Sequence, residues 1–204
     1  MTWTHTGFTQ KIRFGSGVLD DVPSIVRDAG GRRVLLVTTE GRLASADGER
    51  LAKALGRELA SLGPLPVVTS PLRRTRETAA SFERRWGVTA SIDPAVGEIR
   101  SPTDDLAERS AWLAEIIRGQ RRWSDLDVDR QRWRDDVVDA LLALDADTVV
   151  VSHYIAINAA AGSATADDRV VSFRPDNCSC TILESDAHSL TLVELGRQRA
   201  TVVR

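Results

Sequence analysis

Short apolar runs rich in β-branched residues alternate along this chain with longer segments whose apolar residues recur at helical spacing. The short runs predict strands, which lie at residues 9–17, 32–37, 65–70, 87–92, 147–153 and, as antiparallel strands, within 169–195. The periodic segments predict helices, which lie at residues 18–31, 45–63, 72–86, 106–123, 129–144 and 154–162. In the helix at 129–144 the predicted inner face consists of six apolar residues: Trp133, Val137, Val138, Leu141, Leu142 and Leu144.

This order of elements predicts an α/β fold, a three-layer sandwich with a mostly parallel central sheet and a late antiparallel hairpin. Ligands of such sheets bind beyond the carboxyl ends of the strands. Three strand ends are therefore the places where a site is expected: Thr38–Gly41, Ser70–Arg76 and Ser152–Tyr154.

The composition is that of an ordinary globular protein, with 42% hydrophobic and 27% charged residues among 204. A net charge of −2 gives no reason to expect nucleic acid or an anionic membrane as a partner, and no apolar run is long enough to span a bilayer. The amino terminus lacks the pattern of a signal peptide, which predicts a cytoplasmic protein. A homodimer stays open.

The only cysteines, Cys178 and Cys180, stand two apart on a predicted strand, where they would face the same side and be badly placed to pair. They are interpreted as reduced structural thiols. The histidines outside the predicted site, His5 and His188, lack zinc-ligand spacing, so neither a structural metal nor a cofactor is predicted.

The second strand end, Ser70–Arg76, carries the clearest signal of an anion-binding site. Ser70 and Pro71 are predicted to be the N-cap and first-turn pair of the helix that follows, which carries Arg73, Arg74 and Arg76. A helix start offers free N–H groups and a positive dipole end, and guanidinium adds a grip on an oxyanion. Helical spacing separates the arginines, so they cannot all face one site. The competing interpretation is a solvated, charged helix.

The third strand end places His153 directly after the run "TVVVS". A catalytic imidazole is one interpretation, and a packed or helix-capping histidine is the other. The residues of this segment alone do not choose between them.

Two motifs together resemble those of a known family. "SPLRRTRETA" is similar to the SPLxRAxxTA motif of the histidine phosphatase (phosphoglycerate mutase-like) superfamily, and "VVSHYIAINAAAG" to its second histidine motif. The resemblance covers residues 47–200 and implies that fold. It also implies that Arg74, with the helix start at Ser70, binds phosphoryl oxygens, that His153 contacts the transferred group, and that Glu98 protonates the leaving oxygen.

One part of the family pattern is missing. The family's nucleophile is a histidine in an RHG motif after the first strand, but here "VLLV" continues as "TTEG". Thr38 and Thr39 occupy the places of the arginine and the nucleophilic histidine, and both are kept as candidate substrate-binding residues. Threonine needs an activating base, and Glu40 adds negative charge where a phosphate would bind. His5 could supply a histidine only if the amino-terminal tail folded back.

The opening residues resemble another family. Residues 8–42 are similar to the amino-terminal start of iron-dependent alcohol dehydrogenases and maleylacetate reductases, yet the chain lacks their glycine-rich loop and metal-binding histidines. The chain is therefore interpreted as one α/β domain, with residues 1–41 an atypical strand–helix–strand segment and 42–204 a histidine phosphatase-like body.

The predicted function is binding of, or action on, a small phosphorylated or anionic metabolite without the usual phosphohistidine. Two alternatives stay open: a non-catalytic pseudophosphatase that binds a ligand or a protein, and an acid/base enzyme for a non-phosphate substrate. Whether the protein is an enzyme is thus left undecided by the sequence.

Overall fold

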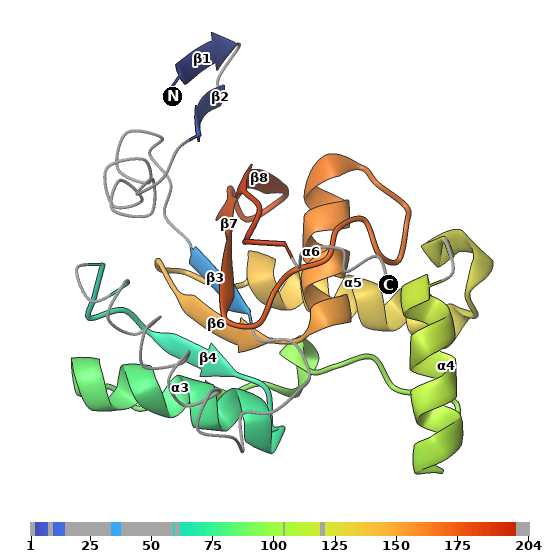
Figure 1. Ribbon diagram of the computed structural model, residues 1–204. Helices are drawn as coiled ribbons and strands as arrows, with labels where there is room; N and C mark the ends of the chain where they lie inside the picture. The colour runs from blue at the N-terminus through green and yellow to red at the C-terminus, as the bar shows by residue number, and fades with distance from the viewer. Residues whose placement is uncertain are drawn as a thin grey trace.

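The computed structural model describes residues 3–7, 10–14, 34–37, 59, 62–103, 105–118 and 121–198. Its strands are β1 Trp3–Gly7, β2 Gln10–Phe14, β3 Val34–Val37, β4 Val67–Thr69, β5 Ser91–Ile92, β6 Val149–Ser152, β7 Ser179–Ser185 and β8 Leu190–Glu194. Its helices are α3 Arg73–Trp86, α4 Leu106–Arg118, α5 Val128–Leu142 and α6 Tyr154–Thr165, with 3₁₀ turns η2 Pro94–Val96 and η3 Trp123–Asp125. Figure 1 shows their arrangement.

The central sheet has six strands in the order β5-β4-β6-β3-β7-β8. Strands β5, β4, β6 and β3 run parallel, and β7 and β8 add an antiparallel hairpin beside β3. This is the predicted mostly parallel sheet. The carboxyl ends of β4 and β6 lie side by side, because Thr69 pairs with Val151.

Strand β6 explains why the fold has three layers. Val149 and Val151 pack with Phe82 and Ala79 of α3, whereas Val150 faces the opposite cluster. Successive side chains of a strand point to opposite faces, so a strand of consecutive valines buries apolar surface on both sides. Helix α3 consequently covers one face of the sheet, and α5 and α6 cover the other (Figure 1).

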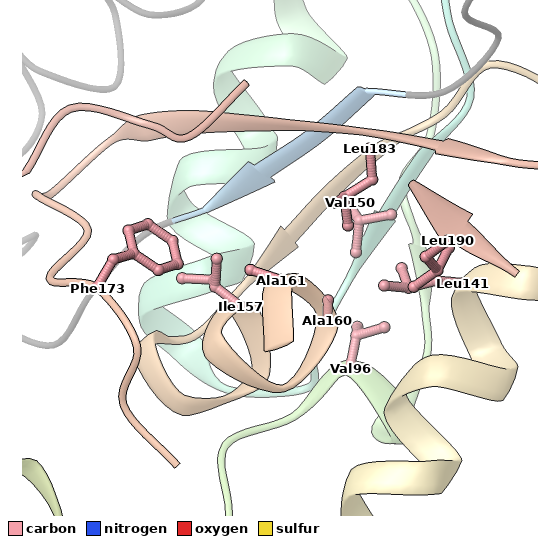
Figure 2. Close-up of a cluster of buried hydrophobic side chains, with 9 residues drawn as sticks. All are labelled: Val96, Leu141, Val150, Ile157, Ala160, Ala161, Phe173, Leu183 and Leu190. Carbon is pink, nitrogen blue, oxygen red and sulfur yellow. The ribbon is translucent and has the colours of Figure 1, made fainter. Parts of the chain in front are cut away.

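The core on the α5 and α6 side is shown in Figure 2. Side chains of the sheet meet Leu141 of α5 and Ile157 and Ala160 of α6. Of the predicted inner face of the helix at 129–144, Val137 and Leu141 are buried, and the other four residues are partly buried against the core. Small alanines on α6 let that helix approach the sheet closely, and this fixes the position of its amino-terminal end beside β6.

Several predicted elements differ from the observed ones. The helix expected over 106–123 ends at Arg118, and Trp123 lies instead in η3 as part of the core around Ile116 and Val137. Helix α6 continues to Thr165, beyond the predicted end at residue 162. Strand β2 lies within the predicted strand 9–17, while β1 was not predicted. The helix predicted at 18–31, and most of that at 45–63, lie outside the described residues.

The cysteines are free thiols, as interpreted from the sequence. The prediction that both lie on a strand was wrong for Cys178, which precedes β7 and has a positive φ of 53°. Burial raises the pKa of the Cys178 thiol to about 11, so it is protonated at neutral pH. Among the helices that the structure describes, none combines the length and the apolar character needed to cross a membrane.

Candidate active site

His153 lies where β6 ends and α6 begins. It is the N-cap residue of α6, its backbone is extended, and its carbonyl accepts the bond from Ile157 N at 3.0 Å. Its imidazole makes no capping bond to the helix and is 0% exposed. The interpretation of a capping side chain is therefore wrong, because the ring is turned toward α3 and bonds other groups there.

Of the three arginines at the start of α3, Arg74 reaches the histidine. Its Nη2 lies 2.8 Å from Nδ1 of His153. Arg73 is exposed and its Nε instead bonds Oε1 of Glu77, one helical turn on, at 2.6 Å. Arg76 is also exposed. The separation of the arginines by helical spacing is thus confirmed.

Ser70 contacts the other nitrogen of the same ring. Its Oγ lies 2.6 Å from Nε2 of His153, 2.8 Å from Oγ1 of Thr75, and 3.2 Å from the backbone nitrogen of Leu72. The prediction that Ser70 and Pro71 cap and begin the helix was wrong: the N-cap is Leu72, and α3 begins at Arg73. Ser70 Oγ bonds the side chains of His153 and Thr75 and the backbone nitrogen of the N-cap residue Leu72.

The chemistry of these groups fixes the direction of each hydrogen bond. Arginine has no acceptor, so Arg74 donates and Nδ1 of His153 accepts. The single proton of a neutral imidazole must then be on Nε2, which donates to Ser70 Oγ. Thr75 donates its own proton to the carbonyl of Leu72 at 2.7 Å, so it accepts the proton of Ser70. The hydrogen bonds therefore all run in one direction, from Arg74 through His153, Ser70 and Thr75 to the carbonyl of Leu72.

Burial, with a smaller contribution from the positive charge of Arg74, lowers the pKa of His153 to about 3. The imidazole is therefore neutral at physiological pH, in agreement with a ring that accepts at one nitrogen and donates at the other. In this state His153 has no proton to give as an acid. A negative ligand beside Arg74 would offset the contribution of the Arg74 charge to this low pKa.

Glu98 is buried at 8% exposure, directly after η2 and Gly97. Its Oε1 accepts a bond from the backbone nitrogen of Ile99 at 3.1 Å. The η2 turn is tied to the end of β6, because Oγ of Ser152 donates to the carbonyl of Val96 at 2.7 Å. Glu98 thus follows a segment held one residue from His153, and its described bond is to the backbone nitrogen of the next residue, Ile99.

The remaining predicted site residues, Thr38 and Thr39, lie outside the described residues. Strand β3 ends directly before them at Val37, whose Cα pairs with that of Ser152. The chain therefore leaves β3 at the same edge of the sheet at which it leaves β6. His5 is part of β1, which pairs with β2 in a separate two-stranded sheet.

Thr75 is a buried member of the network that the sequence interpretation missed. The available signal was a departure from the quoted motif, SPLxRAxxTA, in which alanine follows the arginine. Here the residue after Arg74 is threonine. A hydroxyl in place of a methyl group at a buried position needs a partner, and Ser70 is that partner.

A cleft of about 360 Å³ lies elsewhere on the molecule, between α5 and the carboxyl-terminal part of α6. Gly162, which lines it, lies about 12 Å along the helix axis from Tyr154. No residue of the His153 network lines this cleft. In the described part of the chain no three His, Cys, Asp or Glu side chains converge in a way that could hold a metal ion.

Known structures with the same architecture include three phosphatase-fold proteins. A mycobacterial glucosyl-3-phosphoglycerate phosphatase complexed with VO3 has a TM-score of 0.59 at 20% identity, over 83% of this chain and 100% of that one. Phosphoserine phosphatase from Entamoeba histolytica, in complex with 3-phosphoglyceric acid, has a TM-score of 0.61 at 14% identity, over 82% and 98%. Bacillus stearothermophilus YhfR has a TM-score of 0.62 at 16% identity, over 82% and 98%.

These structural similarities establish the fold. No curated protein is similar enough in sequence to match the chain. The family model of the histidine phosphatase superfamily (branch 1) matches residues 43–198, which include Ser70, Arg74, Glu98 and His153. That match spans most of the chain, and on this ground the protein belongs to the histidine phosphatase superfamily.

Proposed function

We propose that this protein binds a small phosphorylated or anionic metabolite at the carboxyl ends of β4 and β6, and that it does so without a phosphohistidine nucleophile. Arg74 is the principal anion ligand. The observation that carries the proposal is the 2.8 Å bond between its guanidinium and the buried, neutral His153. This bond holds the positive charge of Arg74 at a strand end.

The chemistry of the pocket favours an anion over a neutral ligand. A guanidinium matches the oxygens of a phosphate in a bidentate manner, and α3 begins one residue before Arg74 with its positive dipole end. The names of two related structures agree with this class of ligand, since one is a phosphoglycerate-derivative phosphatase and the other holds 3-phosphoglyceric acid. Both related proteins act on or bind a phosphorylated small molecule.

The absence of a nucleophile is supported by the sequence after β3. The residues there are Thr38, Thr39 and Glu40, where the family has the nucleophilic histidine motif. The other histidines of the chain are His5, in β1, and His188, which is exposed in the turn before β8. His153 does not substitute for the missing residue, because its only lone pair is taken by Arg74.

An enzymatic role stays the second candidate, supported by the buried carboxyl of Glu98. A bound dianion would raise the pKa of His153 and place a charged imidazole against the phosphoryl group. Glu98 could then protonate a leaving oxygen if its carboxyl carries the proton. The neutral state of His153 in the free protein favours binding as the first role.

The proposal is tested with an aryl phosphate assay on the wild type, His153→Ala and Thr39→His. We expect no turnover above the buffer blank from the first two, because an activated nucleophile is missing. Thr39→His, which restores a histidine at the family's position, is expected to hydrolyse the aryl phosphate about tenfold or more above the rate of the buffer blank. Thr191→His, exposed on β8, controls for the mere addition of a histidine.

Calorimetric titration with inorganic phosphate completes the test. Saturable binding to the wild type, together with turnover gained in Thr39→His, supports an intact anion pocket that lacks its nucleophile. Wild-type turnover abolished by His153→Ala would contradict the absence of a nucleophilic mechanism and establish the enzyme instead. If none of the three proteins turned over the aryl phosphate and the wild type bound no phosphate, the anion proposal itself would be overturned.

A further inference from the structure

Consecutive residues of α3 hold the two nitrogens of His153. Arg74 bonds Nδ1 directly, and Thr75, the next residue, reaches Nε2 through the hydroxyl of Ser70. The three side chains that are linked through Nε2 are fully buried, with 0% exposure for Ser70, Thr75 and His153. The ring is therefore held on both sides from the first turn of one helix, in a place that water does not reach.

Ser70 can serve His153 in only one orientation of its hydroxyl. It must present a lone pair to Nε2–H, since Arg74 already occupies the acceptor nitrogen of the ring. Its proton then needs another acceptor, which is Oγ1 of Thr75 at 2.8 Å. With Leu72 N donating to it at 3.2 Å, the Ser70 oxygen makes three bonds and has no free position.

Thr75 is itself fixed by its neighbours. Its hydroxyl donates to the backbone carbonyl of Leu72 at 2.7 Å and lies 3.1 Å from the backbone carbonyl of Ser70. These two backbone carbonyls take the Thr75 proton, so that the Thr75 hydroxyl oxygen can accept the proton of the Ser70 hydroxyl. Alanine, the residue of the quoted motif at this place, would leave the Ser70 proton in a buried site without this acceptor.

We propose that Thr75 is a positioning residue for His153, acting through Ser70: by accepting the Ser70 proton it keeps Ser70 as the acceptor for Nε2–H and so holds the plane of the imidazole in the tautomer that Arg74 sets. Ser70 accordingly acts on the histidine and does not bind the ligand. The role of this network in ligand binding rests on the proposed function, whereas the positioning itself does not.

The test is the Nε2–H proton resonance of His153, followed by NMR in the phosphate-free protein. A buried N–H donated over 2.6 Å gives a far-downfield signal that exchanges slowly with water. We expect the signal in the wild type and in Thr75→Ser, which keeps the hydroxyl. It is expected to move upfield or to broaden beyond detection in Thr75→Val and in Ser70→Ala.

Thr78→Val is the matched control, because Thr78 is also buried on α3 but bonds the carbonyl of Arg74 and not Ser70. Its Nε2–H signal is expected to stay in place. If Thr75→Val does not fold, Thr75→Ala replaces it with the same expectation. An unchanged signal and unchanged line width in the Thr75 variant, beside a lost signal in Ser70→Ala, would overturn the positioning role.

Phosphate binding separates this inference from the proposed function. Loss of one neutral hydrogen bond in the network corresponds to about fivefold weaker phosphate binding in Thr75→Val, with recovery in Thr75→Ser. A wild type that shows the predicted resonance pattern but binds no phosphate would overturn the proposed function and leave the positioning role standing. Phosphate binding by the wild type, together with an unchanged Nε2–H resonance in Thr75→Val, would overturn the positioning role and leave the proposed function standing.

Discussion

Replacing Arg74 with methionine is expected to weaken the binding of inorganic phosphate by about 30- to 1,000-fold. Removing one partner of a desolvated, hydrogen-bonded charge pair costs about 2–4 kcal/mol, and each 1.4 kcal/mol is a factor of ten. Methionine keeps most of the length and apolar volume of the side chain, so the packing around the start of α3 is disturbed little. The effect therefore reports the lost guanidinium.

Calorimetric titration measures this effect, and Arg73→Met is its control. Arg73 precedes Arg74 on the same helix, is exposed, and pairs with Glu77. Both variants remove one positive charge from the first turn of α3, so long-range electrostatics change to a similar extent. We expect Arg73→Met to bind phosphate within about threefold of the wild type. Equal losses in both variants would refute a specific role for Arg74.

The second large effect is on stability in acid. His153 has a pKa of about 3 in the folded protein, against 6.5 for the free side chain. Between these values the unfolded chain binds a proton that the folded protein does not, so acid favours unfolding. The free energy of unfolding is expected to fall by about 2 kcal/mol from this group alone when the pH is lowered from 7 to 5.

Urea unfolding at a series of pH values isolates this contribution. His153→Gln keeps a polar amide in the pocket but cannot titrate, so its stability should decline less between pH 7 and pH 5, by about the same 2 kcal/mol. His188→Gln is the control, because His188 is an exposed turn residue. It should decline as the wild type does. Parallel pH profiles for wild type and His153→Gln would show that the histidine is not held neutral by the fold.

The sheet and the position of the site could be predicted from the sequence, because both depend on strong local patterns. Three consecutive valines before Ser152 indicate a strand buried on two faces, and such a strand lies at the centre of a parallel sheet. A polar residue directly after it must then lie at the carboxyl edge. The bond between His153 and Arg74 follows once both strand ends share that edge.

The details of the network could not be predicted, because they depend on contacts between distant segments. Ser70 precedes a helix, and by local preference it is an N-cap. Its hydroxyl is drawn away by His153, which lies 83 positions further along the chain. The same reason explains Thr75, whose local appearance is that of an ordinary helical threonine and whose function depends on Ser70.

The end of α4 was mispredicted for a related reason. The apolar residues up to Trp123 continue a helical pattern, but that tryptophan packs on Trp133 with ring centroids 5.9 Å apart. Its backbone nitrogen bonds the carbonyl of Asp168 at 2.8 Å, a contact from beyond α6. Tertiary packing thus places Trp123 in η3 and outside the helix that its sequence pattern continues.

Arg74 and His153 are proposed to form the anion site together. The most direct test is a titration of the wild type with inorganic phosphate, in which the imidazole ¹⁵N resonances of His153 are followed at neutral pH. We predict that the Nδ1 resonance shifts, because phosphate binds the guanidinium that donates to this nitrogen, and that the shift saturates at the phosphate concentrations found by calorimetry. Saturable phosphate binding that leaves the His153 resonances unchanged would contradict the account.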